Sequence, residues 1–341
     1  MVQWYNHTFG PQGRHPLHTK VDVLVVGAGP VGLYAAYCAG FRELSVALID
    51  SLPEPGGQVS ALYPEKMIYD IAGYPAVRGR DLVHNLVTQA GRFSPEFLLG
   101  QAAQTLHCHD DGTLEVTSST GQVVRSRAIV VTGGIGTFSP RPLPNGAEFE
   151  GKGLSYFVPH LDEHADRDVV IVGGGDSAFD WALSLQPIAR SVTLVHRRDA
   201  FRAHEYTVRQ VREAGVPILT SSTVAAIRGN GRVAEVDVAH VKTKEVRTLP
   251  AQSVVAALGF LADLGALENW GLQIDARRIL VDSRMSTSVP GVYAAGDITD
   301  YAGKVRLISV GFGEAATAVN NAAVTIDPAA ELFPGHSTEA A

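Results

Sequence analysis

The sequence predicts an α/β protein with two Rossmann-like dinucleotide-binding domains, each a three-layer ββα arrangement around a parallel sheet, the second inserted in the first. The segments VDVLVVGAGPVG (21–32) and RDVVIVGGGDSA (167–178) align without gaps at an offset of 146 residues. Each joins an apolar, β-branched run to a glycine turn and a helical pattern, which is how a βαβ unit begins. At roughly 150 residues per domain, the 341 residues also suffice for two domains.

The elements after the glycine turns repeat in the same order in both copies. Helical patterns at 33–39 and 178–185 lead to second strands at 45–50 and 191–196, whose last residues follow the first glycine of the turn by 23 positions. Hairpin signals at Asp111-Gly112 and Asn230-Gly231 come next, and returning apolar strands end in glycine at 128–134 and 254–259. The two copies therefore predict the same fold.

The copies differ in length between the second strand and the hairpin. Asp50 to Gly112 spans 62 residues and His196 to Gly231 spans 35, so the first copy has 27 more. This excess corresponds to about 52–80, a segment rich in Pro, Gly and Tyr that we interpret as serving a larger ligand. The segment 290–298 and the helical pattern at 314–323 have no counterpart in the first copy and are assigned to completing the first domain. The predicted domains are 1–137 with 256–341, and 138–255.

Composition excludes several classes of function. The net charge of −7 disfavours nucleic acid as a partner. Cys38 and Cys108 are the only cysteines and form no CxxC, so no disulfide framework, all-cysteine zinc site or iron–sulfur cluster is expected, no metal site is predicted, and a cytoplasmic location is favoured. The first twenty residues hold no apolar run of leader length, and glycines interrupt the uncharged stretch 23–41, so no membrane segment is predicted.

The first glycine turn carries a dinucleotide fingerprint. Gly27 permits the tight turn, Gly29 lets the backbone approach a pyrophosphate, and Gly32 lets helix and strand pack closely. Amides at the helix N-terminus would then hold the anion. Asp50, at the end of the second strand, is placed to accept hydrogen bonds from a ribose diol.

The second glycine turn carries the same fingerprint with a different strand end. Gly173 and Gly175 repeat the first two roles, Ala178 takes the third, and Asp176 and Ser177 open the helix. The residues at and after the strand end are cationic or can become so, which suits a 2′-phosphate and predicts NADPH: His196, Arg197, Arg198 and Arg202. A solvated basic face is the alternative reading of this cluster.

Two dinucleotide sites in one chain imply a redox pair, and the larger first copy predicts a flavin, FAD, in the first site. Pro55–Gln58 (PGGQ) offers backbone amides, including that of Gly57, and a side-chain amide. Tyr63 offers a ring for stacking, and Asp297 offers a carboxylate to the ribityl chain. Taken alone, Gln58 and Tyr63 fit a loop residue and a core residue equally well, so the prediction depends on the whole set.

With these motifs in this order, the sequence resembles the thioredoxin-reductase-like flavoproteins. Where that family has its CxxC dithiol, shortly before the second glycine motif, this chain reads LSYFVPHLDEH (154–164), so disulfide reduction is excluded. More narrowly, LYPEKMIYDIAGYP (62–75), HRRDAFRAHE and GKVRLISVGFGEAATAVNNA resemble the ferredoxin–NADP reductases of thioredoxin-reductase-like type. The resemblance runs from about Val21 to Thr338 and leaves 1–20 without an assigned role.

That resemblance implies a homodimer and non-covalent FAD. It also implies that Tyr63 stacks on one face of the isoalloxazine and His336 on the other. Asp50 is shorter than the glutamate often found at its position, and Ala103 replaces a larger aliphatic residue. The implied FAD contacts are Asp50, Gln58, Tyr63, Ala103 through its backbone, Phe138, Asp297 and Thr338.

The function expected from this reading is electron transfer between NADPH and ferredoxin or flavodoxin through FAD, in either direction. The cofactors perform the chemistry, so no catalytic acid or base is predicted. Two rivals stay open: an NADPH-dependent flavin oxidase or monooxygenase, and a redox-sensing module that binds FAD and NADPH without turnover. Binding of an acidic carrier would need a basic patch on this acidic chain. The candidate residues, which could equally be scattered solvated charges, are Lys66, Arg78, Arg80 and Arg92.

Overall fold

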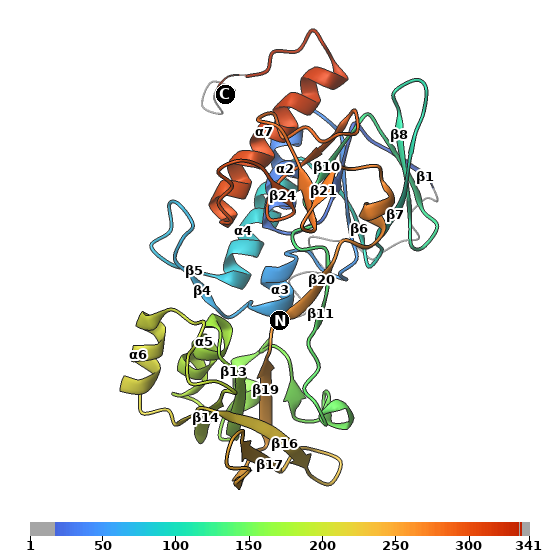
Figure 1. Cartoon of the computed structure of the whole chain (residues 1–341). Coiled ribbons are helices and arrows are strands. Elements are labelled where there is room, and N and C mark those ends of the chain that lie inside the picture. The colour runs from blue at the N-terminus through green and yellow to red at the C-terminus, as the bar shows by residue number, and fades with distance from the viewer. Residues whose placement is uncertain (1–17, 334, 336–341) are drawn as a thin grey trace. The chain divides into compact units, whose positions relative to one another are not determined.

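A computed structural model describes residues 18–333 and 335, and its chain falls into two compact units (Figure 1). The first unit comprises the described residues up to Ser60, Met67–Thr137, and those from Asp263 onward. The second comprises Phe138–Ala262 together with Ala61–Lys66, a short segment just after the PGGQ motif. The strands β11 (Thr137–Pro140) and β20 (Phe260–Asp263), where the chain leaves and re-enters the first unit, pair as a two-stranded sheet.

The first unit is built on a five-stranded parallel sheet of order β23-β10-β2-β3-β6. All residues of β2 and β10 are buried, as expected of strands covered on both faces. The strand β23 comes from the C-terminal segment and lies beside β10, so that segment completes this sheet. The bounds are β2 Val23–Val26, β3 Val46–Asp50, β6 Glu96–Leu99, β10 Ala128–Val131 and β23 Val292–Ala294.

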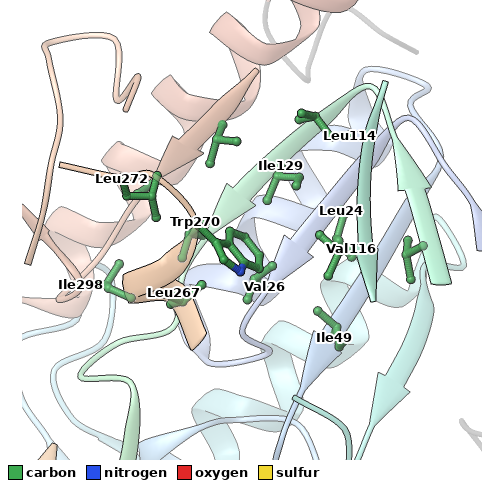
Figure 2. Close-up of a cluster of buried hydrophobic side chains, with 14 of the residues drawn as sticks. Leu24, Val26, Ile49, Leu114, Val116, Ile129, Leu267, Trp270, Leu272 and Ile298 are labelled. Atoms are coloured by element: carbon green, nitrogen blue, oxygen red, sulfur yellow. The ribbon is translucent and has the colours of Figure 1, made fainter. Parts of the chain in front are cut away.

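A mixed sheet of order β1-β9-β8-β7 and three helices cover the two faces of this parallel sheet; β1 pairs with β9 in parallel, and the other pairs are antiparallel. Alternate residues of β2, Leu24 and Val26, form a core cluster with Leu114 and Val116 of this mixed sheet and with Trp270 (Figure 2). Helices α2 and α7 contact strands of the parallel sheet, and α4 packs against α2. The bounds are α2 Pro30–Phe41, α4 Gly79–Gly91, α7 Ile308–Ile326, β1 His18–Lys20, β7 Ala103–Cys108, β8 Leu114–Ser118 and β9 Val123–Ser126.

The shorter elements around the first sheet connect these layers. The segment that is longer in the first copy contains a helix and a hairpin, and two small pairings join the C-terminal part. The bounds are α3 Gln58–Leu62, β4 Met67–Ile68, β5 Val77–Arg78, β21 Ile274–Asp275, β22 Arg278–Leu280, β24 Thr299–Asp300 and a 3-10 helix Gly265–Asn269.

The second unit repeats this architecture on a smaller scale. Its parallel sheet has the order β12-β19-β13-β14-β15, with helices on one face and the antiparallel sheet β16-β17-β18 packed through a second core cluster on the other. The bounds are β12 Leu154–Ser155, β13 Asp168–Gly173, β14 Ser191–Val195, β15 Ile218–Leu219, β16 Ser222–Arg228, β17 Glu235–His240, β18 Val246–Pro250, β19 Ser253–Ala257, α5 Asp176–Leu185, α6 Glu205–Glu213, and 3-10 helices Ala147–Phe149 and Leu161–His164.

The structure confirms the fold class and its internal repeat. The expected helices at 33–39 and 178–185 lie inside α2 and α5. The two hairpin signals join β7 to β8 and β16 to β17, both antiparallel.

Among residues 18–333 and 335, no helix is both long and apolar enough to cross a bilayer. That same part of the chain holds no cluster of three or more His, Cys, Asp or Glu that could bind a metal ion.

A buried histidine makes the stability of the second unit depend on pH. His164 is 5% exposed and shares a hydrogen bond of 2.8 Å with Ser253. Burial lowers the pKa of His164 below its ordinary 6.5. The unfolded chain therefore binds a proton that the folded chain does not, and stability falls as pH drops below 6.5, by at most about 1.4 kcal/mol per pH unit from this group.

We expect His164→Gln to remove this contribution. Urea unfolding at pH 7.5 and pH 5.5 measures the free energy of unfolding of the parent and the variant. The parent should lose more stability between the two pH values than the variant does, whereas equal losses would contradict a neutral, buried His164.

Candidate functional site

The first glycine turn is held by close backbone contacts. Gly27 has φ +112°, and a Cβ there would lie 2.7 Å from the Thr132 carbonyl oxygen. The Thr132 hydroxyl donates to the Gly27 carbonyl at 2.8 Å. A Cβ on Gly32 would overlap the Gly27 carbonyl oxygen, so helix α2 packs against the turn only with glycine there. Gly29 is the N-cap of α2, which has no side-chain cap and no acidic residue in its first turn. This helix end can therefore receive an anion.

Asp50 is bound to the same turn. Its carboxylate accepts hydrogen bonds from the backbone N–H of Ala28 at 2.7 Å and of Leu52 at 2.9 Å. Burial raises the pKa of this carboxyl, and the two N–H donors oppose that shift. A carboxylate has about four acceptor positions, so Asp50 keeps capacity for a ribose hydroxyl beside the glycine turn.

The PGGQ segment lies directly on the first turn. The Gly56 N–H donates to the Ala28 carbonyl at 2.8 Å. Gly57 has φ +55°, and a Cβ on it would come 3.0 Å from the Gly29 Cα, so only glycine allows this approach. A Cβ on Gly134, in the loop after β10, would lie 2.7 Å from the Gln58 side-chain amide nitrogen. The structure therefore brings the predicted Gly57 against Gly29, and the predicted Gln58 side chain against Gly134.

The Gly296-Asp297 turn also reaches the start of α2. Gly296 has φ +84°, and a Cβ there would be 3.2 Å from a methyl group of Val31, within the glycine motif. Asp297 is half-buried, and its carboxylate has no hydrogen-bond partner among the described residues. This carboxylate is thus available to a ligand at the first site.

The remaining residues of the predicted first site have varied positions. Ala103 is the first residue of β7. Two residues earlier, the Gln101 N–H donates to the Asp50 carbonyl at 3.0 Å, which ties this part of the chain to the end of β3. Tyr63 belongs to the second unit and packs against its helix-side core cluster. The backbone of Phe138 lies in β11, but its side chain, like all of His336 and Thr338, is outside the described part of the structure.

The second glycine turn differs from the first at its third position. A Cβ on Gly173 would lie 2.5 Å from the Ala257 carbonyl oxygen, so this glycine is required. Ala178 is fully buried at the start of α5 and takes the third position of this motif, equivalent to Gly32 in the first turn. The second turn therefore accepts a methyl group where the first requires glycine. Gly175 is the N-cap of α5 without a side-chain cap, and the Ser177 side chain beside it is exposed. This helix end can receive a second pyrophosphate.

The loop 196–204 is fastened to this second turn at three points. The Arg202 N–H donates to the Gly174 carbonyl at 2.8 Å, and the His204 N–H donates to the Asp176 carboxylate at 2.9 Å. The His196 ring fills the space where a Cβ on Gly174 would project. Asp176, predicted as a cofactor contact, therefore has a partner within the chain.

The positive charge of this loop comes from its three arginines. Burial, followed by the neighbouring Arg197 and Arg198, lowers the pKa of His196 below 6.5, so its ring is neutral near pH 7. The side chains of Arg197, Arg198 and Arg202 are exposed, and none has an ion-pair partner among the described residues. Unpaired guanidinium groups beside a helix N-terminus fit the 2′-phosphate of NADPH.

The predicted basic docking patch is weaker than its sequence indicates. Lys66 pairs with Asp180 at 2.5 Å within the second unit, which neutralises its charge. Arg92 is exposed at the end of α4 in the first unit.

Sequence reasoning missed two sets of polar contacts. One is the Ala28 amide that Asp50 binds, which no side-chain pattern marks. The other is a buried ion pair of Lys304 and Glu314 behind the Gly296-Asp297 turn. A single acid in the otherwise uncharged helix α7, ISVGFGEAATAVNNAAVTI, is the signal that could have found it.

Comparison with known proteins bears on both sites. Residues 21–322 match the family described as pyridine nucleotide-disulphide oxidoreductase. The chain is 63% identical to the ferredoxin–NADP reductase of Frankia alni over 316 residues, covering 93% of this chain and 98% of that protein. It is 48% identical to the ferredoxin–NADP reductase of Halalkalibacterium halodurans over 320 residues, covering 93% of this chain and 97% of that protein.

Solved structures show the same similarity at the level of the fold. Thioredoxin reductase from T. acidophilum superposes with a TM-score of 0.75 at 26% identity, over 88% of this chain and 96% of its own. Thioredoxin reductase from Lactococcus lactis gives a TM-score of 0.75 at 25% identity, over 90% of this chain and 99% of its own. Both glycine turns described above lie within residues 21–322, the part of the chain that matches the family.

Proposed function

Because this chain belongs to the pyridine nucleotide-disulphide oxidoreductase family and, within it, to the ferredoxin–NADP reductases of thioredoxin-reductase-like type, we propose that it passes electrons between NADPH and ferredoxin through FAD. The family predicted from the motifs is confirmed. The observation that supports the proposal most strongly is the pair of uncapped glycine-turn helices, one beside a carboxylate and the other beside three unpaired arginines.

The first unit offers the groups that an FAD needs. When bound, FAD accepts a hydride and releases electrons singly, which is chemistry that no side chain of this protein supplies. The free amides at the start of α2 would bind the pyrophosphate, Asp50 a ribose hydroxyl, and Asp297 the ribityl chain. Gln58 and Ala103 complete the contacts we propose here.

Contacts from Phe138 and Thr338, and stacking of Tyr63 and His336 on the isoalloxazine, remain proposals that rest on the family resemblance. We also propose that Gly173, Gly175 and Ser177 bind the pyrophosphate of NADPH in the second unit. The loop anchored by Asp176 and His196 would then place the three arginines at the 2′-phosphate.

The chain lacks the dithiol chemistry that the family name describes. Cys38 and Cys108 are both free thiols, and no CxxC occurs anywhere in the sequence. Burial raises the pKa of the Cys38 thiol to about 12, so it stays protonated at neutral pH and is a poor nucleophile. We therefore propose that electrons pass between the flavin and an external carrier without a dithiol of this chain.

Finer features of the proposal rest on the resemblance and on composition. We propose that flavodoxin can replace ferredoxin as the carrier, that the protein is a homodimer, and that it works in the cytoplasm, where its two thiols would stay reduced. Light scattering on the eluted protein measures the oligomeric state directly.

Steady-state reduction of cytochrome c by NADPH tests the proposed function. Ferredoxin should strongly raise the rate, because it takes electrons from the flavin one at a time and passes them to cytochrome c. A rate that does not respond to ferredoxin would contradict the proposal.

A further inference from the structure

A buried ion pair lies directly behind the Gly296-Asp297 turn. The side chains of Lys304 and Glu314 are 2% and 5% exposed, and the ammonium nitrogen lies 2.5 Å and 2.7 Å from the two carboxylate oxygens. The Tyr301 hydroxyl donates to the same carboxylate at 2.6 Å. Burial, and then this hydrogen bond, raise the pKa of Tyr301 to about 12, so the phenol keeps its proton.

The pair binds both polar groups of one peptide residue. The Gly296 N–H donates to Glu314 Oε2 at 2.7 Å, and Lys304 Nζ donates to the Gly296 carbonyl oxygen at 2.9 Å. All three ammonium hydrogens of Lys304 therefore have acceptors: the Gly296 carbonyl and the two Glu314 oxygens. We call Tyr301, Lys304 and Glu314 the turn clamp.

Helix α7 brings the clamp to the turn. A Cβ on Gly311 would lie 3.4 Å from the Gly296 Cα and 2.5 Å from a Val31 methyl group, so glycine lets α7 approach both the turn and the start of α2. Contacts between α2 and α7 extend along the two helices (Figure 1). The turn is thus fixed between the first glycine motif and the clamp.

Stability alone does not account for charged groups in this place. Two desolvated charges usually stabilise a fold no better than apolar side chains that fill the same volume. Apolar side chains, however, would leave the Gly296 N–H buried without a partner. The Gly296 carbonyl would lose the Lys304 ammonium and keep only the Thr299 N–H and hydroxyl, at 3.0 Å and 2.8 Å. The clamp therefore fixes one backbone geometry at the residue before Asp297.

We infer that Lys304 and Glu314 are positioning residues, which hold the Asp297 carboxylate where it binds FAD. This inference rests on the proposed function, because it assumes that the first site holds FAD. Neither residue is proposed to touch the cofactor. Each fixes the backbone of the Gly296-Asp297 turn and so sets the position of the Asp297 carboxylate.

The test is the dissociation constant of FAD, measured by flavin fluorescence as the full-length holoprotein is diluted. Glu314→Gln should weaken FAD binding about tenfold, since charge-assisted hydrogen bonds to the turn are lost. The double variant Lys304→Met/Glu314→Gln leaves no buried unpaired charge and keeps the test available if the single variant does not fold. Arg284→Gln, in an exposed ion pair of the same unit, is the matched control and should bind FAD as the parent does.

A double-mutant cycle with Asp297→Ala separates positioning from general support of the fold. Once the carboxylate is gone, the clamp variants should change FAD affinity less than twofold, while their cost in thermal stability should be the same in both backgrounds. Equal losses of FAD affinity in both backgrounds would overturn the inference, as would unchanged affinity in the clamp variants. A parent protein that binds no FAD would instead overturn the proposed function.

Discussion

Replacing Gly32 by alanine is expected to weaken FAD binding by about 10- to 100-fold. The new Cβ would overlap the Gly27 carbonyl oxygen and approach the Thr132 hydroxyl to 2.7 Å. That hydroxyl is bonded to the Gly27 carbonyl, so neither obstacle can move without opening the turn. Overpacking of this kind costs about 1–3 kcal/mol, and the turn it opens is the one proposed to hold the pyrophosphate.

Gly91→Ala is the matched control, because a Cβ on Gly91, at the end of α4, meets no atom within 4 Å. Both variants change a glycine to alanine in the first unit, and both are purified and reconstituted with FAD. Flavin content and the dissociation constant are then measured by absorbance and fluorescence. Equal FAD affinity in the two variants would contradict the role of Gly32.

Replacing Arg197 and Arg198 together by alanine should raise the KM for NADPH by more than tenfold. Each charge-assisted hydrogen bond to a phosphate contributes roughly 1.5–3 kcal/mol, which is about 10- to 100-fold in affinity. The KM for NADH should change little, since NADH lacks the 2′-phosphate. The kinetics of flavin reduction with each coenzyme give both values.

Arg209→Ala provides the comparison for that measurement. Arg209 is exposed on α6 of the same unit and pairs only loosely with Glu213, at 3.9 Å. It should leave both coenzymes unaffected. Equal losses with NADPH and NADH in the Arg197 and Arg198 double variant would show that these arginines support the fold and do not bind the 2′-phosphate.

The sequence was sufficient for the parts of the two sites that depend on strand and helix register. Asp50 ends β3 and His196 directly follows β14, each 23 positions after the first glycine of its turn, Gly27 or Gly173. Parallel pairing carries each strand end to its glycine turn. The position of Gly57 does not follow from strand register. Gly57 lies in the Pro- and Gly-rich segment by which the first copy exceeds the second, and that excess indicated a role in the first site. These features follow from the number of residues between motifs, which the sequence gives directly.

Features that depend on hydrogen-bond direction were not visible. Nothing in the sequence shows that Asp176 accepts the His204 N–H, or that partial burial lowers the pKa of His196. The clamp is equally hidden, because Lys304 precedes α7 and Glu314 lies within it, and only the approach of that helix to Gly296 brings the two side chains together. These contacts require the packed chain.

The most direct test of the central claim is anaerobic stopped-flow mixing of the FAD-loaded protein with NADPH, followed by oxidised ferredoxin. We expect stoichiometric NADPH to bleach the flavin absorbance and ferredoxin to restore it within the time of a catalytic turnover, with reduced ferredoxin formed in step. Flavin that NADPH cannot bleach would identify a binding module without turnover. Flavin that NADPH bleaches and ferredoxin does not reoxidise, but that oxygen reoxidises when admitted in a parallel run, would identify an oxidase or monooxygenase. Either result would contradict the account.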